Sequence, residues 1–376
     1  MKSSWRIGCI AGIDLHLHFT FLILLGWIVL SHYFQRHDWQ DALGGLAFTL
    51  SLFTIVVLHE LGHALMARRF GIRTRDITLL PIGGIARLER IPEKPKQELL
   101  VALAGPAVNI VLATLLFVVL FVGAELSAAK EFQLVGGNFL AKLMWINVSL
   151  GVFNLLPAFP MDGGRVLRAL LAMRMDYVRA TNIAASIGQS MAWVFGFIGL
   201  FTNPFLMFIA LFVWIGAAQE AEQVRMKSAL AGLPVSRVMM TDFRTLAPDD
   251  TLARAVEHIL SGSQQDFPVV ERGHVVGVLT RADLLTGLAK QGQVASVADV
   301  MQRNVCEAEP DEMVEGVLAG LQQNDCKVLP VTRNGELVGI LTVENLGEYL
   351  MIETALGEAA QAKRAKPTPA ASPRKT

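Results

Sequence analysis

The residues best suited to chemistry are two histidines and a glutamate in the segment His59-Glu60-Leu61-Gly62-His63. On a helix, His59 and His63 share one face because they are four residues apart, and both imidazoles can then reach one zinc ion. Glu60 lies beside that position, where its carboxylate can act as a general base. Ionisable residues inside an apolar segment are costly unless they have a function. The spacing therefore predicts a zinc centre on a helix that lies within a membrane.

A catalytic zinc ion needs a third protein ligand and one open position for water, and Asp162 is the candidate. It lies in the segment 154–165, which reads Asn-Leu-Leu-Pro-Ala-Phe-Pro-Met-Asp-Gly-Gly-Arg. Its two prolines and two glycines forbid a continuous helix, and irregular backbone at membrane depth is tolerated only against protein or beside a wet cavity. The alternative is that Asp162 caps the helix that follows.

With three protein ligands in place, the expected reaction is hydrolysis of a peptide bond. Zinc lowers the pKa of bound water towards about 7 and polarises the carbonyl that is attacked. Glu60 can take the proton from that water and deliver it to the leaving amine. If the substrate were itself a membrane helix, its carbonyls would be in helical hydrogen bonds, and the bond to be cut would first have to lie in an extended segment.

The segment 72–88 is the candidate for holding such an extended peptide. Its partial alternation, its β-branched residues and Gly83-Gly84 predict short strands with a bend at the membrane edge. An exposed strand edge can pair with an unwound peptide by strand addition. The alternative is a surface hairpin that only covers the helices.

Composition places the chain among membrane proteins. Of its 376 residues, 53% are hydrophobic, and the mean hydropathy is +0.45. The apolar fraction exceeds that of an average soluble protein. The formal net charge is zero, so no overall basic field indicates a nucleic-acid partner.

Apolar stretches with at most one Asp, Glu, Lys or Arg predict the membrane helices, because about 20 apolar residues are needed to cross the hydrocarbon. Six such stretches predict a polytopic α-helical membrane domain with six transmembrane helices. They lie between Asp14 and Arg36, over about 45–67, between Glu98 and Glu125, over about 136–157, and on either side of Asn203-Pro204 between Arg179 and Glu220.

Basic residues predict the orientation of these helices. They gather in the connections after the second and fourth spans. These residues are Arg68, Arg69, Arg73, Arg75, Arg87, Arg90, Lys94, Lys96, Arg165, Arg168, Arg174 and Arg179. Since basic connections stay in the cytoplasm, both termini are expected on that side of the cell membrane. The two histidines would then lie in the cytoplasmic half of the second span.

An internal duplication follows the membrane helices. Met239 recurs as Met301, an offset of 62 residues (301 minus 239), and Pro268 recurs as Pro330 at the same offset. Each copy is predicted to contain a helix, two strands and a second helix. A repeat of this period indicates paired α/β modules that bury their faces against each other.

The two motifs in the membrane part resemble those of site-2 proteases, the zinc intramembrane metalloproteases. His59 to His63 resembles the first family motif, and the segment 154–165 matches the second, Asn-x-x-Pro-x-x-Pro-x-Asp-Gly-Gly-Arg. The segment 104–109, Ala-Gly-Pro-Ala-Val-Asn, resembles another recurrent family sequence. The resemblance covers about residues 10–224.

This resemblance implies a role for each motif residue. The metal ligands would be His59, His63 and Asp162, and the general base would be Glu60. Asn154 would lie near the scissile carbonyl, and Gly83 and Gly84 would lie near the substrate. The implied substrate is a single-span membrane protein, such as an anti-sigma factor or a similar signalling protein.

The duplicated part resembles a tandem pair of CBS domains, which are usually adenine-nucleotide sensors. Segments 275–283 and 337–345 resemble the most diagnostic stretch of that family. The resemblance implies that ATP or AMP contacts Thr280 and Asp283 in the first copy, and Thr342 and Asn345 in the second. Asn345 departs from the stronger aspartate form. The alternative is a dimerising module without a ligand.

The predicted organisation has three parts. Residues 1–224 form the transmembrane zinc metalloprotease, residues 225–352 the cytoplasmic CBS pair (about 235–291 and 296–352), and residues 353–376 a disordered tail. The predicted function is intramembrane proteolysis modulated by adenine nucleotide, in a chain that pairs into a homodimer through its CBS domains. The alternatives are a CBS-regulated transporter or channel, with His59, Glu60 and Asp162 lining an ion path, and a catalytically dead zinc scaffold.

Overall fold

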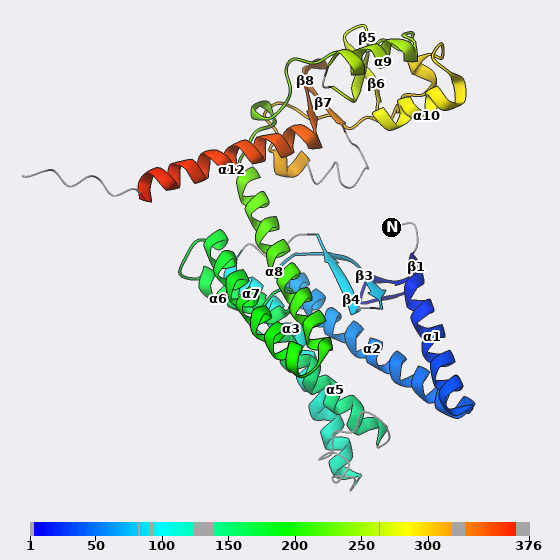
Figure 1. Ribbon diagram of the computed structural model, residues 1–376, viewed down its shortest axis with the longest axis vertical. Coiled ribbons are helices and arrows are strands. Elements are labelled where there is room, and N and C mark those ends of the chain that lie inside the picture. Colours follow the sequence, from blue (N-terminus) through cyan, green and yellow to red (C-terminus); the bar gives the residue numbers. More distant parts are fainter. Residues whose placement is uncertain are drawn as a thin grey trace, which may run out of the picture. The chain divides into compact units, whose positions relative to one another are not determined.

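The chain divides into two compact units, Met1–Val224 and Arg225–Thr376. The computed structural model describes residues 4–81, 83–89, 94–123, 138–262, 264–317 and 328–365. Helices dominate the first unit, and strands and helices alternate in the second (Figure 1). Each unit has hydrophobic clusters of its own.

Long apolar helices form most of the first unit. Within the described residues, four helices are long and apolar enough to cross a membrane: α2 (Trp39–Arg69), α3 (Pro95–Val122), α7 (Tyr177–Phe201) and α8 (Pro204–Leu230). Two shorter apolar helices, α1 (Phe19–Arg36) and α5 (Phe139–Asn154), stand at the first and fourth predicted spans. The domain is therefore helical with membrane-length helices, and the count of six spans stays a prediction. Residues 124–137, which include the expected start of the fourth span, lie outside the described part.

A four-stranded sheet completes this unit. Its strands are β1 (Ser4–Ile10), β2 (Ile13–His18), β3 (Thr74–Leu80) and β4 (Gly83–Leu88), in the spatial order β1-β2-β3-β4. Strands β2 and β3 run parallel, and the other neighbours run antiparallel. Two strands lie where the segment 72–88 predicts them. The first two strands were not predicted, and α1 starts at Phe19 rather than after Asp14, because residues 13–18 alternate apolar and polar types with the period of a strand.

The sheet packs against α1 and α2. The shared cluster contains Ile13, Leu15, Phe21, Phe53, Val57, Ala64, Ile77 and Leu79. A Cβ atom at Gly84 would lie 3.0 Å from Glu60 Cγ and 3.1 Å from Val56 Cγ1. The start of β4 therefore touches the helix turn that carries Glu60, and a larger residue there would push strand and helix apart.

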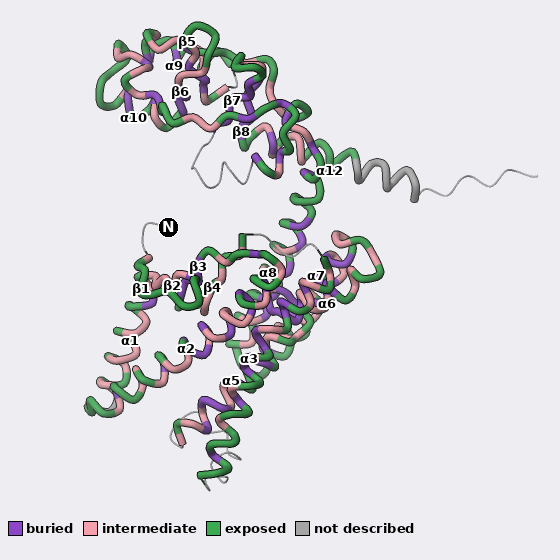
Figure 2. Tube along the Cα trace, turned by 180° about the vertical axis from the view of Figure 1, so that it is seen from behind, coloured by how far each residue is buried: buried purple, intermediate pink, exposed green. Residues whose placement is uncertain are grey.

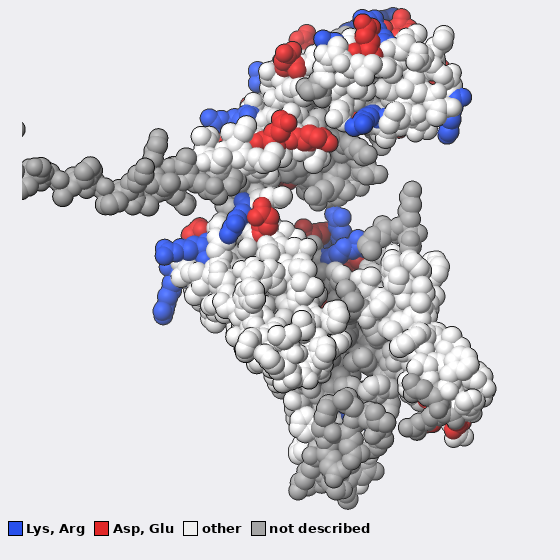
Figure 3. Space-filling view, viewed as in Figure 1, with Lys and Arg blue, Asp and Glu red and all other residues white. Residues whose placement is uncertain are grey.

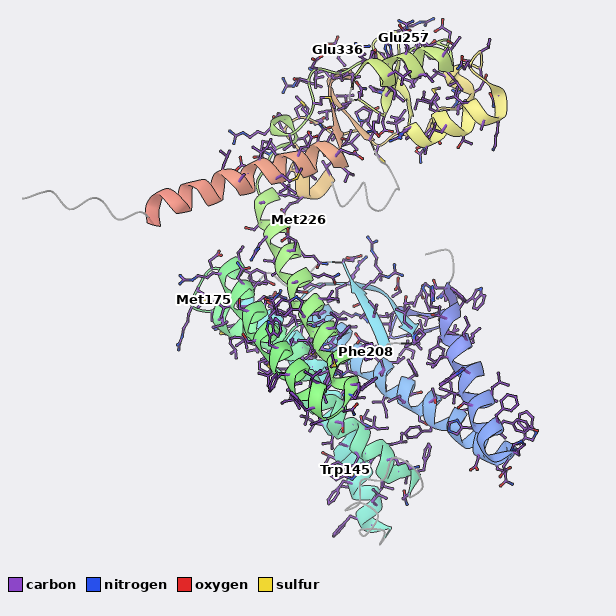
Figure 4. All side chains as sticks on the ribbon, viewed as in Figure 1. Trp145, Met175, Phe208, Met226, Glu257 and Glu336 are labelled. Carbon is purple, nitrogen blue, oxygen red and sulfur yellow. The ribbon has the colours of Figure 1, made fainter. Side chains whose placement is uncertain are left out.

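The outer surface of the first unit is apolar. Large exposed side chains include Trp27, Trp193, Phe197, Phe201 and Phe208. Buried residues concentrate instead where α3, α6 (Asp162–Ala172) and α7 meet (Figure 2). On the face in Figure 3 the helices are broadly uncharged, and Lys and Arg gather at one end. The side chains of Trp145 and Met175 mark opposite ends of the unit (Figure 4). Such an apolar belt is typical of a protein that lies in a bilayer.

The second unit contains the duplicated modules. The first copy has α9 (Leu252–Ser261), β5 (Phe267–Glu271), β6 (His274–Leu279) and α10 (Arg281–Gln291). The second has β7 (Val328–Arg333), β8 (Glu336–Thr342) and α12 (Val343–Ala365), and the helix expected before β7 falls largely on residues 318–327, outside the described part. Strands β5 and β6 form one antiparallel hairpin, and β7 and β8 form another.

Each copy makes the same contact with the other. The sulfur of Met301 lies 2.6 Å from where a Cβ atom of Gly277 would stand, and the sulfur of Met239 lies 2.7 Å from the same position at Gly339. Each methionine lies near the start of one copy and packs on the hairpin of the other. The repeat found in the sequence is thus also a repeat of contacts.

Helix α12 extends beyond the predicted end of the second copy. It continues through Ala365, so residues 353–365 are helical where the sequence analysis expects disorder. This stretch is rich in Ala, Glu, Gln and Lys, which have high helix propensity and continue a helix that is already started. Residues 366–376 lie outside the described part.

Candidate active site

Helix α2 places both histidines of the first motif on one buried face. His59 is 7% exposed and His63 is 6% exposed. Their Nε2 atoms lie 3.1 Å apart. Asp162, which is about one hundred residues further along the chain, places its Oδ2 atom 3.2 Å from His59 Nε2 and 3.0 Å from His63 Nε2. Three donor atoms from two distant segments therefore converge on one point.

The spacing of these three atoms fits a small metal ion. A tetrahedral zinc centre with bonds of about 2.0 to 2.1 Å holds its donor atoms roughly 3.3 Å apart. The observed separations of 3.0 to 3.2 Å are close to that value. Two imidazoles and one carboxylate also form a donor set that zinc accepts, with a fourth position left for water. Among the described residues, His59, His63 and Asp162 are the group of His, Cys, Asp or Glu that can hold a metal ion.

A backbone carbonyl orients one of the two imidazoles. His63 Nδ1 donates to the carbonyl oxygen of Val101 at 2.7 Å. In a neutral imidazole this leaves the lone pair on Nε2, which faces the other two donors. Such a partner behind a ligating histidine fixes both the tautomer and the ring orientation. Nδ1 of His59 is buried and has no partner among the described residues.

Asp162 is the first residue of α6, which starts directly after the irregular segment 155–161. The N-cap of α6 is Met161, so the alternative that Asp162 caps this helix does not describe the structure. A Cβ atom at Gly163 would run into the carbonyl groups of Leu155 and Leu156. The glycine after Asp162 thus allows the helix start to pack on the preceding loop.

The loop before Asp162 is also held by glycines of α7 and α8. A Cβ atom at Gly188 would lie 3.2 Å from Ala158 Cα, and one at Gly216 would lie 2.6 Å from Pro160 Cδ. Both helices therefore approach the loop closely, and at Gly216 a Cβ atom would collide with the proline ring. The carboxylate of Asp162 is positioned by tight packing on its loop.

Charge and burial act in opposite directions on Asp162. Burial on its own would raise the pKa of this carboxyl, but N–H groups and positive charge on the adjoining imidazoles of His59 and His63 outweigh burial and hold the pKa well below its ordinary value. The ionised carboxylate is also the form that binds a metal ion.

Gly105 of α3 makes room for the two imidazoles. A Cβ atom there would lie 2.7 Å from His59 Nε2 and even closer to His63 Nε2. No sequence pattern predicts this role, although Gly105 stands within the segment 104–109 that resembles a family sequence. The local signal for it is Gly105 itself, since a glycine inside a long apolar helix usually has a packing reason.

Glu60 is half-buried on α2, between its two histidines in sequence. No described residue donates a hydrogen bond to its carboxylate. Gly84 packs against its side chain, and the neighbouring Gly83 has φ +135°, a value that L side chains rarely adopt. The structure thus brings Glu60 and the Gly-Gly bend together.

Asn154 is the last residue of α5 and is half-buried. Its side chain makes no hydrogen bond to any described residue, the three metal-site donors included. Its predicted place near a scissile carbonyl stays a prediction.

The candidate nucleotide residues pair within each CBS copy. Thr280 Oγ1 donates to Asp283 Oδ2 at 2.5 Å, and the backbone N–H of Asp283 donates to Thr280 Oγ1 at 3.2 Å. Thr342 Oγ1 donates to Asn345 Oδ1 at 2.7 Å, and the N–H of Asn345 donates back at 3.2 Å. Both pairs stand at the start of a helix, α10 or α12. Gln302 Nε2 donates to Asp283 Oδ2 at 2.8 Å and adds a contact to the first pair.

Known proteins with similar sequences agree with both predicted resemblances. The model of peptidase family M50 matches residues 47–136 and 129–195, and the CBS domain model matches residues 235–290 and 297–351. A zinc metalloprotease of Methanocaldococcus jannaschii is 34% identical, over 91% of this chain and 94% of that protein. Stage IV sporulation protein FB of Bacillus subtilis is 32% identical, over 45% of this chain and 58% of that protein.

Among solved structures, the site-2 protease from Methanocaldococcus jannaschii is 38% identical and covers 58% of this chain and 95% of its own, with a TM-score of 0.43. The recognition made from the motifs is confirmed, and so is the assignment as an enzyme. The long match to the archaeal zinc metalloprotease places this chain, a membrane zinc metalloprotease with tandem CBS domains, in peptidase family M50, the site-2 proteases.

Proposed function

We propose that this metalloprotease cuts a peptide bond within or near the transmembrane segment of another membrane protein, and that His59, His63 and Asp162 hold its one zinc ion. The observation that carries this proposal is the convergence of their donor atoms, which all lie within 4.8 Å of one another in a buried position. Hydrogen bonding among these groups alone would leave lone pairs facing each other, whereas a shared cation satisfies all three.

Glu60 is the general base of the proposed reaction. A bound zinc ion supplies Lewis acidity, which makes nearby water more acidic and polarises a peptide carbonyl. Glu60 takes the proton of the attacking water and later passes it to the amine that leaves. Its carboxylate can do this because it has no hydrogen-bond donor among the described residues.

The free edge of β4 is the proposed substrate platform. Among the described strands, β4 pairs with β3 alone, and its second residue, Gly84, touches the helix turn of Glu60. A peptide that adds to this edge would have its backbone held extended beside the base. Asn154, at the end of α5, is the proposed polar contact for the scissile carbonyl.

The membrane arrangement belongs to the same proposal. Six spans, four formed by the long helices and two by α1 and α5, would put both termini and the CBS unit in the cytoplasm. The strands β3 and β4 would then lie at the membrane edge, where water can reach the metal. The substrate class that fits is a single-span membrane protein, such as an anti-sigma factor or a similar signalling protein.

The CBS pair is proposed to bind ATP or AMP and so to modulate cleavage. Thr280 with Asp283, and Thr342 with Asn345, offer hydroxyl, carboxylate and amide groups that suit ribose and phosphate. Pairing of two chains through these domains would give a homodimer.

Replacement of Glu60 by Gln tests the catalytic proposal. The purified full-length protein in detergent, given a single-span substrate, should keep its zinc but cut about 100- to 10,000-fold more slowly, because the base is lost. Glu257→Gln, a change at an exposed residue of α9, is the matched control and should cut at the normal rate. Normal cleavage by the Glu60→Gln protein would contradict the assignment of the base.

A further inference from the structure

The strongest unexplained feature of the first unit is a buried arginine on the helix of Asp162. Arg168 is fully buried, which is rare for a charged residue. Its Nε atom donates to Glu98 Oε1 at 2.8 Å, and its Nη1 atom donates to Glu220 Oε1 at 2.6 Å. These carboxylates come from α3 and α8. The three residues therefore join α3, α6 and α8 around one guanidinium.

Two aromatic rings complete the surroundings of Arg168. Its guanidinium carbon lies 5.0 Å from the ring centre of Phe159 and 5.0 Å from that of Tyr177. Phe159 is fully buried in the loop that leads into Asp162. The guanidinium is thus bound both to its helix partners and to the loop that positions the carboxylate, in a geometry that suits a planar cation.

One face of α3 holds both halves of the metal site. The buried residues Glu98, Val101 and Gly105 repeat at helical spacing. Glu98 binds Arg168 on the helix of Asp162, and the carbonyl of Val101 accepts from His63. Gly105 lies against both imidazoles. The position of Asp162 relative to the histidines therefore depends on where α6 sits along α3.

We propose that Arg168 is a positioning residue for the metal site, which fixes α6 to α3 through Glu98 and so sets the carboxylate of Asp162 against His59 and His63. This inference rests on the proposed function, since it assumes that Asp162 is a ligand. A buried ion-pair set that served only stability would be replaceable as a whole by uncharged residues, because desolvation offsets most of the gain from such ion pairs. A positioning role requires the directed hydrogen bonds themselves.

Zinc affinity of the full-length protein in detergent is the test, measured by competition with a chelator. Arg168→Met should weaken zinc binding by about tenfold, the lower end of the range for groups that hydrogen-bond a metal ligand directly, because Arg168 acts on Asp162 through its helix and loop. When Co²⁺ replaces zinc, the visible spectrum of the bound Co²⁺ should also differ between Arg168→Met and the unaltered protein. Arg168→Lys keeps the charge and one hydrogen bond, so it should recover part of the affinity. Arg254→Met, which removes an exposed arginine paired with Asp250, is the matched control and should bind zinc normally.

Arg168→Met leaves two carboxylates without their partner, and it risks failing to fold. The triple variant Glu98→Gln, Arg168→Met, Glu220→Gln removes all three charges and leaves no unpaired ion buried. It should still bind zinc about tenfold more weakly. Normal zinc affinity and a normal Co²⁺ spectrum in a folded Arg168→Met protein, or in the triple variant, would overturn the positioning role.

Asp162→Asn separates this inference from the proposal on which it rests. If Asp162→Asn binds zinc normally, the ligand assignment itself fails, whatever Arg168 does. If Asp162→Asn loses zinc while the Arg168 variants keep it, the ligand assignment stands and only the positioning role is wrong.

Discussion

The two units each place an aspartate in the first turn of a helix, and the two aspartates have different surroundings. In the CBS unit, Asp283 hydrogen-bonds Thr280, three residues earlier in the same turn of α10. In the membrane unit, Asp162 has no such local partner and instead meets His59 and His63 from another helix. Local pairing is what helix capping requires. A carboxylate that meets distant imidazoles in a buried position has a different task.

Whether a polar group is satisfied by its local neighbours separates groups that serve structure from groups that serve chemistry. The Thr280–Asp283 pair satisfies its own hydrogen bonds, so it is stable without a ligand and can also accept one. The three donor atoms of the proposed metal site point at each other, and a cation between them would satisfy all three. Substitutions in the membrane unit are therefore expected to act on metal binding, and those in the CBS unit chiefly on stability and nucleotide binding.

Asp162→Asn is expected to have the largest effect. An amide is a poorer zinc ligand and carries no charge, so zinc affinity should fall by more than about 100-fold, beyond the loss typical of groups behind the ligands. Chelator competition and metal content of the purified protein measure this, and substrate cleavage should disappear in parallel. An Asp162→Asn protein that keeps its zinc would remove the contrast between the two aspartates.

Gly105→Ala is expected to come next. The added Cβ would collide with both imidazoles, so they must shift, and zinc affinity should fall by roughly tenfold, as when ligand orientation is disturbed. Gly26→Ala is the matched control, because a Cβ atom at this exposed helical glycine of α1 meets nothing within 4 Å. Equal zinc affinity in the two variants would show that α3 does not fit closely under the histidines.

Thr280→Val tests the local pair in the first CBS copy. Loss of the hydroxyl removes the cap of α10, and the free energy of unfolding of this unit should fall by about 1 kcal/mol. Chemical unfolding followed by spectroscopy measures the change, and calorimetry should show weaker ATP or AMP binding. Thr286→Val, at an exposed threonine of α10 that bonds only the carbonyl of Ala282, is the control and should change stability by less than about 0.5 kcal/mol. A cap that contributes nothing would give the two variants the same stability.

The parts of the site that could be predicted from sequence are those with a local signature. The spacing of His59 and His63 needs only the period of a helix, and the Pro and Gly residues around Asp162 signal an irregular backbone. The duplication at 62 residues and the strands of the segment 72–88 are likewise local patterns. Recognition of two motifs then made the enzyme class predictable, and the comparisons confirm it.

The parts that were missed depend on contacts between distant segments. Nothing near Gly105 in sequence shows that two imidazoles will lie against it, and nothing near Arg168 shows that Glu98 and Glu220 will reach it. In sequence, Arg168 belongs with the basic residues that predict membrane orientation, because an arginine in a connection is normally exposed. Strands β1 and β2 were missed for a different reason. Their alternation was overlooked beside the strong apolar signal of α1.

Asn345→Asp is expected to have the smallest effect and sharpens the comparison between the two CBS copies. The copies differ here, since Asp283 in the first corresponds to Asn345 in the second, with the same hydrogen bond to the capping threonine. A carboxylate in the first turn of α12 would interact favourably with the helix dipole and stabilise the unit by about 0.3 to 1 kcal/mol. Asp283→Asn should cause the opposite change in the first copy. Thermal unfolding measures both, and calorimetry should show that the second copy gains affinity for ATP or AMP when it carries the aspartate. Stability changes of opposite sign and similar size in the two variants would show that the copies differ in this one group. A gain of stability without a gain of nucleotide affinity would assign residue 345 to helix capping alone.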